Sequence, residues 1–279
     1  MMIVDLNQVM LSNLMMQLGN HTNAAVEESM VRHMVLNSLR SYNVKFGSEY
    51  GEMVIACDNT NYWRKQAFPY YKANRKKNQE KSELDWKSIF ETMNKIRAEL
   101  KEYFPYRVID IESAEADDVI ATLVFQSDAD KILILSGDKD FIQLHSYRNV
   151  SQYDPVRKKW IKHDNPKRYL LEHILKGDSG DGVPNILSSD NCFVVGERQR
   201  PLTQKKIDSI INTLPEIDEQ ISSNYKRNKK LIDLTEVPEE ISKKILESYE
   251  AQNSKGRDKL FNYFVANKLK HLMEHIGEF

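Results

Sequence analysis

An apolar run that ends in two closely spaced carboxylates constrains the fold of this chain more than any other segment. Residues 131–135 leave no position for a polar face, so they predict a strand buried on both sides of a sheet. Asp138 and Asp140 follow at once, and positions i and i+2 of an extended chain point the same way. We therefore expect both carboxylates at the carboxyl end of the strand, where open α/β sheets bind ligands. Alternatively, either Asp could cap a helix starting near Phe141.

Further apolar runs predict the rest of this sheet. We expect strands over residues 2–6, 53–58 and 107–111, and a hairpin over 150–162. Helical spacing predicts helices over 27–42, 84–103 and 114–125, and Ser113 is the expected N-cap of the last one. Alternating strands and helices predict an α/β fold with a mostly parallel central sheet flanked by helices. The chain beyond about residue 165 reads as mainly helical, which predicts two parts, 1–165 and 166–279.

Composition excludes several classes of protein. The 279 residues are 41% hydrophobic and 29% charged, an ordinary globular balance, and the net charge of −1 indicates no particular partner. The two cysteines, Cys57 and Cys192, show no CxxC spacing, so we expect no disulfide framework. The seven histidines form no HxxxH pair with cysteine support, so we expect no zinc site. No apolar run approaches a membrane span, and Asp5 interrupts the first one, so we expect neither a membrane segment nor a signal peptide.

Acidic residues recur where the predicted strands end. Two Asp lie in a glycine-rich turn that cannot continue a helix, and an acidic pair opens the helix after the third strand. The full set is Asp5, Asp58, Glu115, Asp117, Asp138, Asp140, Asp178 and Asp181. Gathered at one edge, so many carboxylates could not all stay ionised without divalent cations. Oxygen ligands select Mg²⁺ or Mn²⁺, and two such ions ~4 Å apart suit phosphodiester hydrolysis. Two interpretations without metal remain possible. The acidic residues at 115–118 could simply be stabilised by the helix dipole, and residues 177–185 could be a plain polar turn.

Residues 62–81 mix basic side chains with aromatic ones. A basic segment with interleaved aromatics is typical of contacts to phosphates and stacked bases. The residues concerned are Arg64, Lys72 and Arg75 among the basic ones, and Trp63, Phe68, Tyr70 and Tyr71 among the aromatic ones. The alternative is a solvated charged helix. We favour the nucleic-acid interpretation because the aromatic residues lie inside the basic run.

Together these motifs resemble the 5′-nuclease (flap endonuclease) superfamily. The resemblance rests on Cys-Asp58-Asn, Tyr-Lys72-Ala-Asn-Arg75, Glu115-Ala-Asp117-Asp118, Ser-Gly-Asp138-Lys-Asp140-Phe and Gly-Asp178-Ser-Gly-Asp181-Gly. They occur in order over nearly the whole chain. Residues 30–38, 174–178 and the ending Gly-Glu-Phe279 resemble the RNase H branch of T-even-type phages.

The resemblance implies a PIN-like 5′-nuclease core, with a basic arch over about 62–85, and a helix–three-turn–helix for duplex DNA within 174–200. It implies a Mg²⁺-dependent 5′→3′ exonuclease and flap endonuclease that removes RNA primers in the cytoplasm of an infected host. Asp5, Asp58, Asp117 and Asp138 would hold one metal. Asp140, Asp178 and Asp181 would serve a second, partly through water, with Glu115 alongside and Asp118 in support. Arg64, Lys72 and Arg75 would steady the scissile phosphate.

Partners follow from the same resemblance. The substrate would be 5′-flap or nicked duplex DNA and RNA–DNA hybrid, and the protein would act as a monomer. The C-terminal tail would dock on a phage sliding clamp, because a terminal Phe beyond a glycine has little reason to lie in a core. A single-stranded-DNA-binding protein would be a second partner.

Two other functions remain open at this stage. An aspartate-nucleophile phosphatase also uses Asp-x-Asp after a strand, but it needs a Lys partner and no basic arch. A replication accessory could bind branched DNA without cutting it, although acidic residues would then repel the DNA for no gain.

Overall fold

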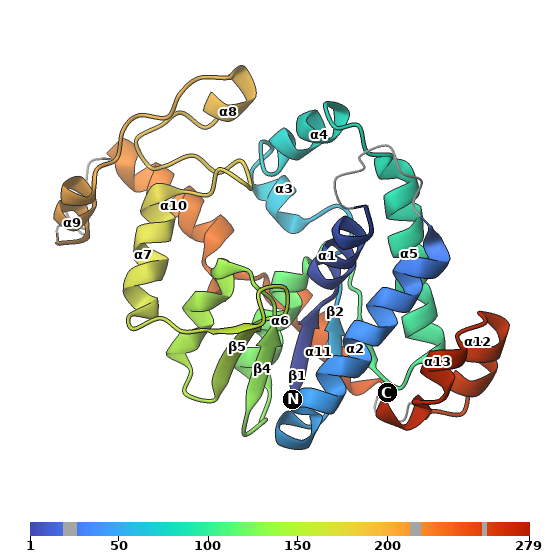
Figure 1. Cartoon of the computed structure of the whole chain (residues 1–279). Coiled ribbons are helices and arrows are strands. Elements are labelled where there is room, and N and C mark those ends of the chain that lie inside the picture. The colour runs from blue at the N-terminus through green and yellow to red at the C-terminus, as the bar shows by residue number, and fades with distance from the viewer. Residues whose placement is uncertain (19–26, 213–218, 253–255) are drawn as a thin grey trace.

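A six-stranded sheet forms the centre of the protein (Figure 1). The computed structural model describes residues 1–18, 27–212, 219–252 and 256–279. The strands are β1 (Met2–Asp5), β2 (Met53–Ala56), β3 (Arg107–Ile109), β4 (Ile132–Leu135), β5 (Val150–Asp154) and β6 (Lys159–Ile161), in the spatial order β3-β2-β1-β4-β5-β6. All neighbouring pairs are parallel except the β5–β6 hairpin. The predicted fold class, its strands and the hairpin are confirmed.

Helices cover both faces of the sheet, which explains its apolar strands. Alternate residues of β1 face opposite sides, so Val4 joins one core and Ile3 the other. The first core packs against α1 (Leu6–Leu18), α2 (Glu28–Tyr50) and α5 (Trp86–Tyr103). The second packs against α6 (Ala116–Gln126) and α11 (Glu239–Glu250), on the other side of the sheet in Figure 1. No edge of β1 or β4 is free, because each lies between two other strands.

Local sequence explains where the flanking helices begin. Helix α5 starts after Asp85, whose side chain accepts a hydrogen bond from the Ser88 amide at 3.1 Å. Helix α6 starts later than predicted. Ser113 has a φ of 68° and does not cap it; Glu115 is the N-cap, and it forms a capping box with Asp118. The prediction for Ser113 was wrong because a reverse turn precedes the helix.

The second half of the chain is mainly helical, as predicted. It contains α7 (Pro166–Lys176), α8 (Cys192–Val195), α9 (Gln204–Asn212), α10 (Glu219–Ile232), η3 (Leu234–Glu236) and α11. Asn165 caps α7, and Pro166 occupies its first turn. Helix α7 packs against α10 and against η1 (Lys139–Ser146), the 3₁₀ helix that follows β4. Among the described residues, no helix combines the length and the hydropathy that a membrane span requires.

The C-terminal residues belong to the core. Helices α12 (Leu260–Ala266) and α13 (Lys270–Met273) and the 3₁₀ turn η4 (Ile276–Glu278) pack beside α5 and α2 (Figure 1). Phe279 is only 1% exposed, and its ring lies 5.7 Å from Phe104 and 5.2 Å from Phe264. Arg257 donates to its carbonyl oxygen at 2.7 Å. The expectation that Phe279 lies outside the core was wrong, because the rings of Phe104 and Phe264 form a pocket for it.

Candidate active site

Four acidic residues meet at the carboxyl edge of the sheet; we call them the inner group. Asp5 ends β1, and Asp138 follows β4, the strand beside it. Chain order reverses between these two strands, and such a switch point opens the crevice in which α/β proteins bind ligands. Asp58 follows β2, and Asp117 lies in the first turn of α6. The predicted convergence of Asp5, Asp58, Asp117 and Asp138 is therefore present in the structure.

Hydrogen bonds fix the orientation of the inner group. Asp5 accepts from the Gln8 amide and from the Ser136 hydroxyl, each at 3.1 Å. Asp58 accepts from the Ala116 amide at 2.7 Å, so the start of α6 is tied to the end of β2. Asp138 accepts from the Asp140 amide at 3.0 Å, so the capping role weighed for Asp138 is also correct. Asp138 can cap η1 and still belong to the inner group, because its second carboxylate oxygen is left for another partner.

The inner group is electrostatically unfavourable without a cation. Burial, and then the charges of Asp58 and Asp138, raise the pKa of Asp5 from 3.8 to about 7. Burial, and then the charges of Asp138 and Glu115, raise the pKa of Asp117 well above its ordinary value. Asp5 and Asp117 therefore favour the protonated form when the neighbouring carboxylates are ionised.

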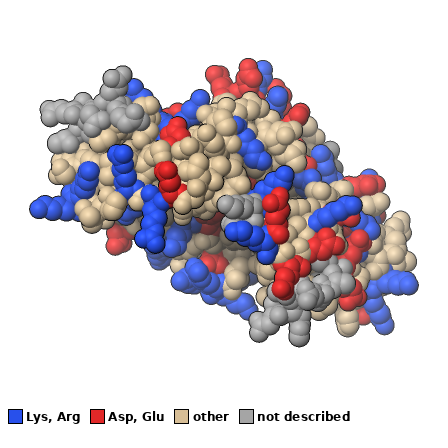
Figure 2. Space-filling view, turned by 90° about the horizontal axis from the view of Figure 1, so that it is seen from above, with Lys and Arg blue, Asp and Glu red and all other residues tan. Residues whose placement is uncertain are grey.

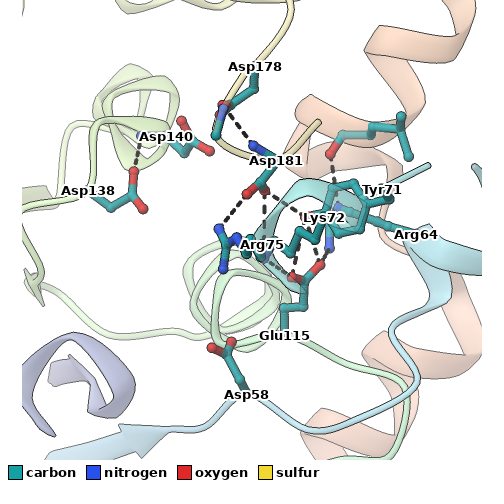
Figure 3. Close-up of polar contacts among 12 residues, drawn as sticks. Asp58, Arg64, Tyr71, Lys72, Arg75, Glu115, Asp138, Asp140, Asp178 and Asp181 are labelled. Atoms are coloured by element: carbon teal, nitrogen blue, oxygen red, sulfur yellow. Dashed lines mark hydrogen bonds and ion pairs between the residues drawn. The ribbon is translucent and has the colours of Figure 1, made fainter. Parts of the chain in front are cut away.

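A second set of three carboxylates, which we call the outer group, lies next to Asp138. Asp140 comes from η1, and Asp178 and Asp181 come from the glycine-rich loop after α7 (Figure 3). Burial, and then the charges of Asp138, Asp178 and Asp181, raise the pKa of Asp140 to about 7. A cavity of about 10 Å³, roughly the room of one water molecule, is lined by Asp117 as well as by all three outer carboxylates. The two groups thus face one site.

Basic side chains close one side of this site. The ammonium of Lys72 pairs with Glu115 and lies 3.6 Å from Asp181, while Arg75 pairs with Asp181 (Figure 3). Lys72 is held in place by its own backbone, which donates to the Asp181 carbonyl at 2.7 Å and has a φ of 56°. Arg75 is half exposed, so its guanidinium can still reach a ligand outside the site.

Gly182 allows the basic segment to approach the acidic loop. Its φ is +73°, and a Cβ built on it would lie 2.9 Å from the Tyr70 carbonyl oxygen. Any larger residue would have to push residues 70–72 away from the loop. This contact explains how two segments about 110 residues apart in the chain are held together.

Arg64 lies elsewhere than predicted. Its side chain is 2% exposed, pairs with Glu115 at 2.9 Å and Asp118 at 2.8 Å, and donates to the Leu231 carbonyl at 2.9 Å. A guanidinium enclosed in this way cannot also contact a scissile phosphate, so that part of the prediction was wrong. Asp118 has the supporting role expected of it, because it also accepts from Trp63 at 3.1 Å and caps α6.

Most aromatic residues of the basic segment are also structural. Trp63, Phe68 and Tyr71 are all buried, and their rings belong to hydrophobic clusters. They cannot stack on bases in this arrangement, so the argument from interleaved aromatics was wrong for these three. The segment forms α3 (Trp63–Ala67) and α4 (Ala73–Glu80), and the buried aromatics anchor these helices to the body of the protein.

Sequence reasoning missed two side chains of the site. The Tyr71 hydroxyl donates to Asp181 at 2.8 Å and lies 3.1 Å from a Glu115 oxygen. His173 lies in the last turn of α7, with one ring nitrogen 3.6 Å from Asp140 and the other 3.6 Å from Asp178. Its position one turn before the acidic loop was the available signal, but a single histidine forms no HxxxH pair and therefore did not stand out as a ligand.

The donors fit divalent cations. Oxygen atoms dominate the site, as Mg²⁺ and Mn²⁺ prefer, and several of them have pKa values raised by one another. Seen from above the carboxyl ends of the strands, Lys and Arg side chains project around the hollowed middle of this face (Figure 2). An acidic centre bordered by basic side chains such as Lys72 and Arg75 suits a polyanion bound through metal ions.

A doubly wound α/β sheet with clustered carboxylates at its switch point fits the class of metal-dependent nucleases. Comparisons with known proteins agree. Residues 2–172 match the family described as "5'-3' exonuclease, N-terminal resolvase-like domain", and residues 165–279 match "T4 RNase H, C terminal". The chain belongs to this 5′–3′ exonuclease family, with the C-terminal region of the T4 RNase H type.

Individual relatives support the same assignment. The chain is 38% identical to the ribonuclease H of phage T4, over 99% of this chain and 95% of that protein. It is 31% identical to a flap endonuclease Xni of Shewanella, over 44% of this chain and 48% of the relative. A solved complex of a bacteriophage T5 flap endonuclease with DNA and metal ions shares the fold. Its TM-score is 0.65 at 17% identity, covering 91% of this chain and 99% of the other.

Proposed function

We propose that this nuclease uses two divalent ions, Mg²⁺ with Mn²⁺ as a substitute, to hydrolyse phosphodiesters near 5′ ends of flap, nicked and RNA–DNA duplexes. One observation carries the proposal. Asp5, Asp117 and Asp140 have raised pKa values because burial and neighbouring carboxylates disfavour their charge, and all three face the switch point of the sheet. Such an arrangement is tolerable when cations join it.

Each group of carboxylates has its own proposed ion. Asp5, Asp58, Asp117 and Asp138 would hold the first. Asp140, Asp178 and Asp181 would hold the second, partly through water, since Asp181 already accepts from Tyr71 and Arg75. Glu115 lies alongside, with its oxygens occupied by Arg64, Tyr71 and Lys72. The bound ions would supply charge neutralisation and an activated water at the phosphorus.

Lys72 and Arg75 are the proposed phosphate contacts. Lys72 is preorganised by Glu115 and by its backbone bond to the acidic loop, so little reorganisation is needed when negative charge develops on the phosphate. Arg75 is exposed enough to meet a phosphate one nucleotide away. Arg64 is proposed to act through Glu115 and Asp118 as a structural residue.

The proposal keeps the two parts expected from the sequence and assigns each a task. Residues 1–165, including the basic arch at 62–85, are proposed to cut, and residues 166–279 to bind duplex DNA. The helix–three-turn–helix within 174–200 would grip the backbone. Gly177 and Gly182, with φ values of +67° and +73°, shape the loop between them, and glycine allows phosphates to approach backbone amides.

The proposed biological role is removal of RNA primers during phage DNA replication, by a monomer in the cytoplasm of the infected host. The phage sliding clamp and single-stranded-DNA-binding protein are proposed partners. Because Phe279 is packed in the core, a clamp contact through the tail would require this residue to leave its pocket. Clamp stimulation should therefore be compared between the full chain and a chain shortened by residues 276–279, after both are shown to be folded.

The alternatives have less support. A phosphatase of the aspartate-nucleophile type would need a lysine beside Asp138, whereas Lys72 pairs with Glu115 and Asp181. A DNA-binding accessory that does not cut would gain nothing from carboxylates whose charge is disfavoured before DNA arrives.

Cleavage of a 5′-labelled flap duplex tests the proposal. The parent and the control Asp130→Asn, changed at an exposed residue, should cut with Mg²⁺ and not with EDTA. Asp138→Asn should bind the duplex in a gel-shift assay and release no product. Cutting in EDTA, or release of phosphate from a monoester without cutting, would contradict the proposal. Metal-dependent binding without product by the parent would favour the accessory function.

A further inference from the structure

His173 lies within the outer group, and the proposed function assigns it no role. It projects from the last turn of α7 between Asp140 and Asp178. Nδ1 lies 3.6 Å from an Asp140 oxygen, and Nε2 lies 3.6 Å from an Asp178 oxygen. The side chain is only 14% exposed, so bulk water does not surround the ring.

Within the part of the chain that the structure describes, one nitrogen of this ring lacks a hydrogen bond. Nδ1 is buried and has no hydrogen-bond partner among the described residues. Both contacts to carboxylates are longer than an N–H···O bond, which spans about 2.7–3.2 Å. Its aromatic neighbour Tyr169 lies 6.0 Å away, centroid to centroid. Buried polar atoms are normally paired, so an unpaired ring nitrogen beside two carboxylates indicates a missing partner.

The spacing suits a metal ion as that partner. One ring nitrogen and one oxygen from each of Asp140 and Asp178 all lie within 4.8 Å of one another. Ligands with bonds of about 2.1 Å stand about 3 Å apart at right angles and about 4.2 Å apart when opposite. The observed contacts fall near this range, so small side-chain rotations are enough to bring the three atoms onto one ion.

We propose that His173 donates a ring nitrogen to the outer divalent ion, together with Asp140 and Asp178, and shifts this position toward Mn²⁺ and other transition metals. The inference rests on the proposed function, since it refines the ligand set of the same site. Mg²⁺ strongly prefers oxygen ligands, whereas imidazole suits the transition metals. Asp5, Asp58, Asp117 and Asp138 offer oxygen alone, so the two positions would differ in metal preference.

Pulsed electron paramagnetic resonance on protein loaded with Mn²⁺, without DNA, tests the assignment. The parent protein and two variants, His173→Gln and His271→Gln, would be loaded at pH 8 and examined for modulation from a directly bound ¹⁴N nucleus. His271 is an exposed histidine on α13 and serves as the matched control. Calorimetric titrations with Mn²⁺ and with Mg²⁺ give affinities for the same three proteins, and circular dichroism checks that each is folded.

The expected result is nitrogen coupling in the parent and in His271→Gln, and none in His173→Gln. Mn²⁺ affinity at the outer position should fall about tenfold or more in His173→Gln, with a smaller loss for Mg²⁺. Absence of nitrogen coupling in the parent would overturn the assignment. Tighter binding of both metals by His173→Gln would also overturn it, because the ring would then act as a competing cation.

Flap cleavage by the parent protein, measured in parallel, distinguishes a failure of the His173 assignment from a failure of the proposed nuclease function. Mg²⁺-dependent cleavage without nitrogen coupling would remove only the role of His173. If the parent protein neither cleaves the flap nor binds metal, the proposed function itself is contradicted.

Discussion

Changing Asp5 to Asn should stabilise the metal-free protein at pH 8. Burial and the charges of Asp58 and Asp138 raise the pKa of Asp5 from 3.8 to about 7, a shift of about 3 units. At 1.36 kcal/mol per unit, keeping Asp5 ionised at pH 8 costs the folded state up to about 4 kcal/mol. The amide preserves the local bonds, since its oxygen can accept from Gln8 and its NH₂ can donate to Ser136.

The sign of the pH dependence follows from the same shift. Below about pH 4 the carboxyl is protonated in both folded and unfolded chains, so Asp5 contributes no penalty. Between about pH 4 and 7 the unfolded chain loses its proton first, and the free energy of unfolding falls as the pH rises. Above about pH 7 the penalty is complete. The gain from Asp5→Asn should therefore be near zero at pH 4 and largest at pH 8.

Urea unfolding in EDTA at several pH values measures this gain. Asp130→Asn, in the exposed loop before β4, is the control and should leave the difference between pH 4 and pH 8 unchanged. Saturating Mn²⁺ should reduce or reverse the advantage of Asp5→Asn, since the parent alone keeps the full ligand set. A variant less stable than the parent at pH 8 in EDTA would refute the electrostatic reasoning for this site.

Four further changes probe other parts of the account. Asp138→Asn should reduce flap cleavage by about 10³-fold or more and leave duplex affinity nearly unchanged; parental rates would remove Asp138 from the metal site. Lys72→Ala should lower kcat about 10²-fold with a smaller effect on DNA affinity, and a loss confined to affinity would contradict its role at the phosphate. Gly182→Ala should cut more slowly, because its Cβ displaces the Tyr70 carbonyl; an unchanged rate would show that this contact is dispensable. Phe279→Ala should lower the free energy of unfolding by about 3–5 kcal/mol, and a change below about 1 kcal/mol would argue against a core role.

The sheet and the inner group could be predicted because their signals are local. Strands β1, β2 and β4 are short apolar runs buried on both faces, and each ends in a carboxylate or is followed closely by one. Parallel pairing therefore brings Asp5, Asp58 and Asp138 to one edge. The choice of Asp117 as a ligand followed from the resemblance, because on a regular helix Glu115 shares a face with Asp118, three residues on, and not with Asp117. In the structure Glu115 is extended and the helix starts at Ala116, two residues later than predicted, with Asp117 in its first turn.

The predictions that were wrong depend on contacts between distant parts of the chain. Arg64 is buried because the Leu231 carbonyl, 167 residues away, and two acidic side chains of α6 enclose its guanidinium. Phe279 is buried because Phe104 and Phe264 form its pocket. These distant contacts cannot be recognised from the neighbouring sequence. A basic residue and a terminal aromatic residue are both expected to be exposed when only the local pattern is considered. His173 was missed for the same reason, since its relation to Asp140 depends on the packing of α7 against η1.

Anomalous scattering from a crystal grown with Mn²⁺ can locate the ions that the carboxylates at the switch point are proposed to hold. We expect one peak among Asp5, Asp58, Asp117 and Asp138, and a second peak within bonding distance of Asp140 and Asp178. Peaks located away from the switch point, or none at saturating Mn²⁺, would contradict this proposal.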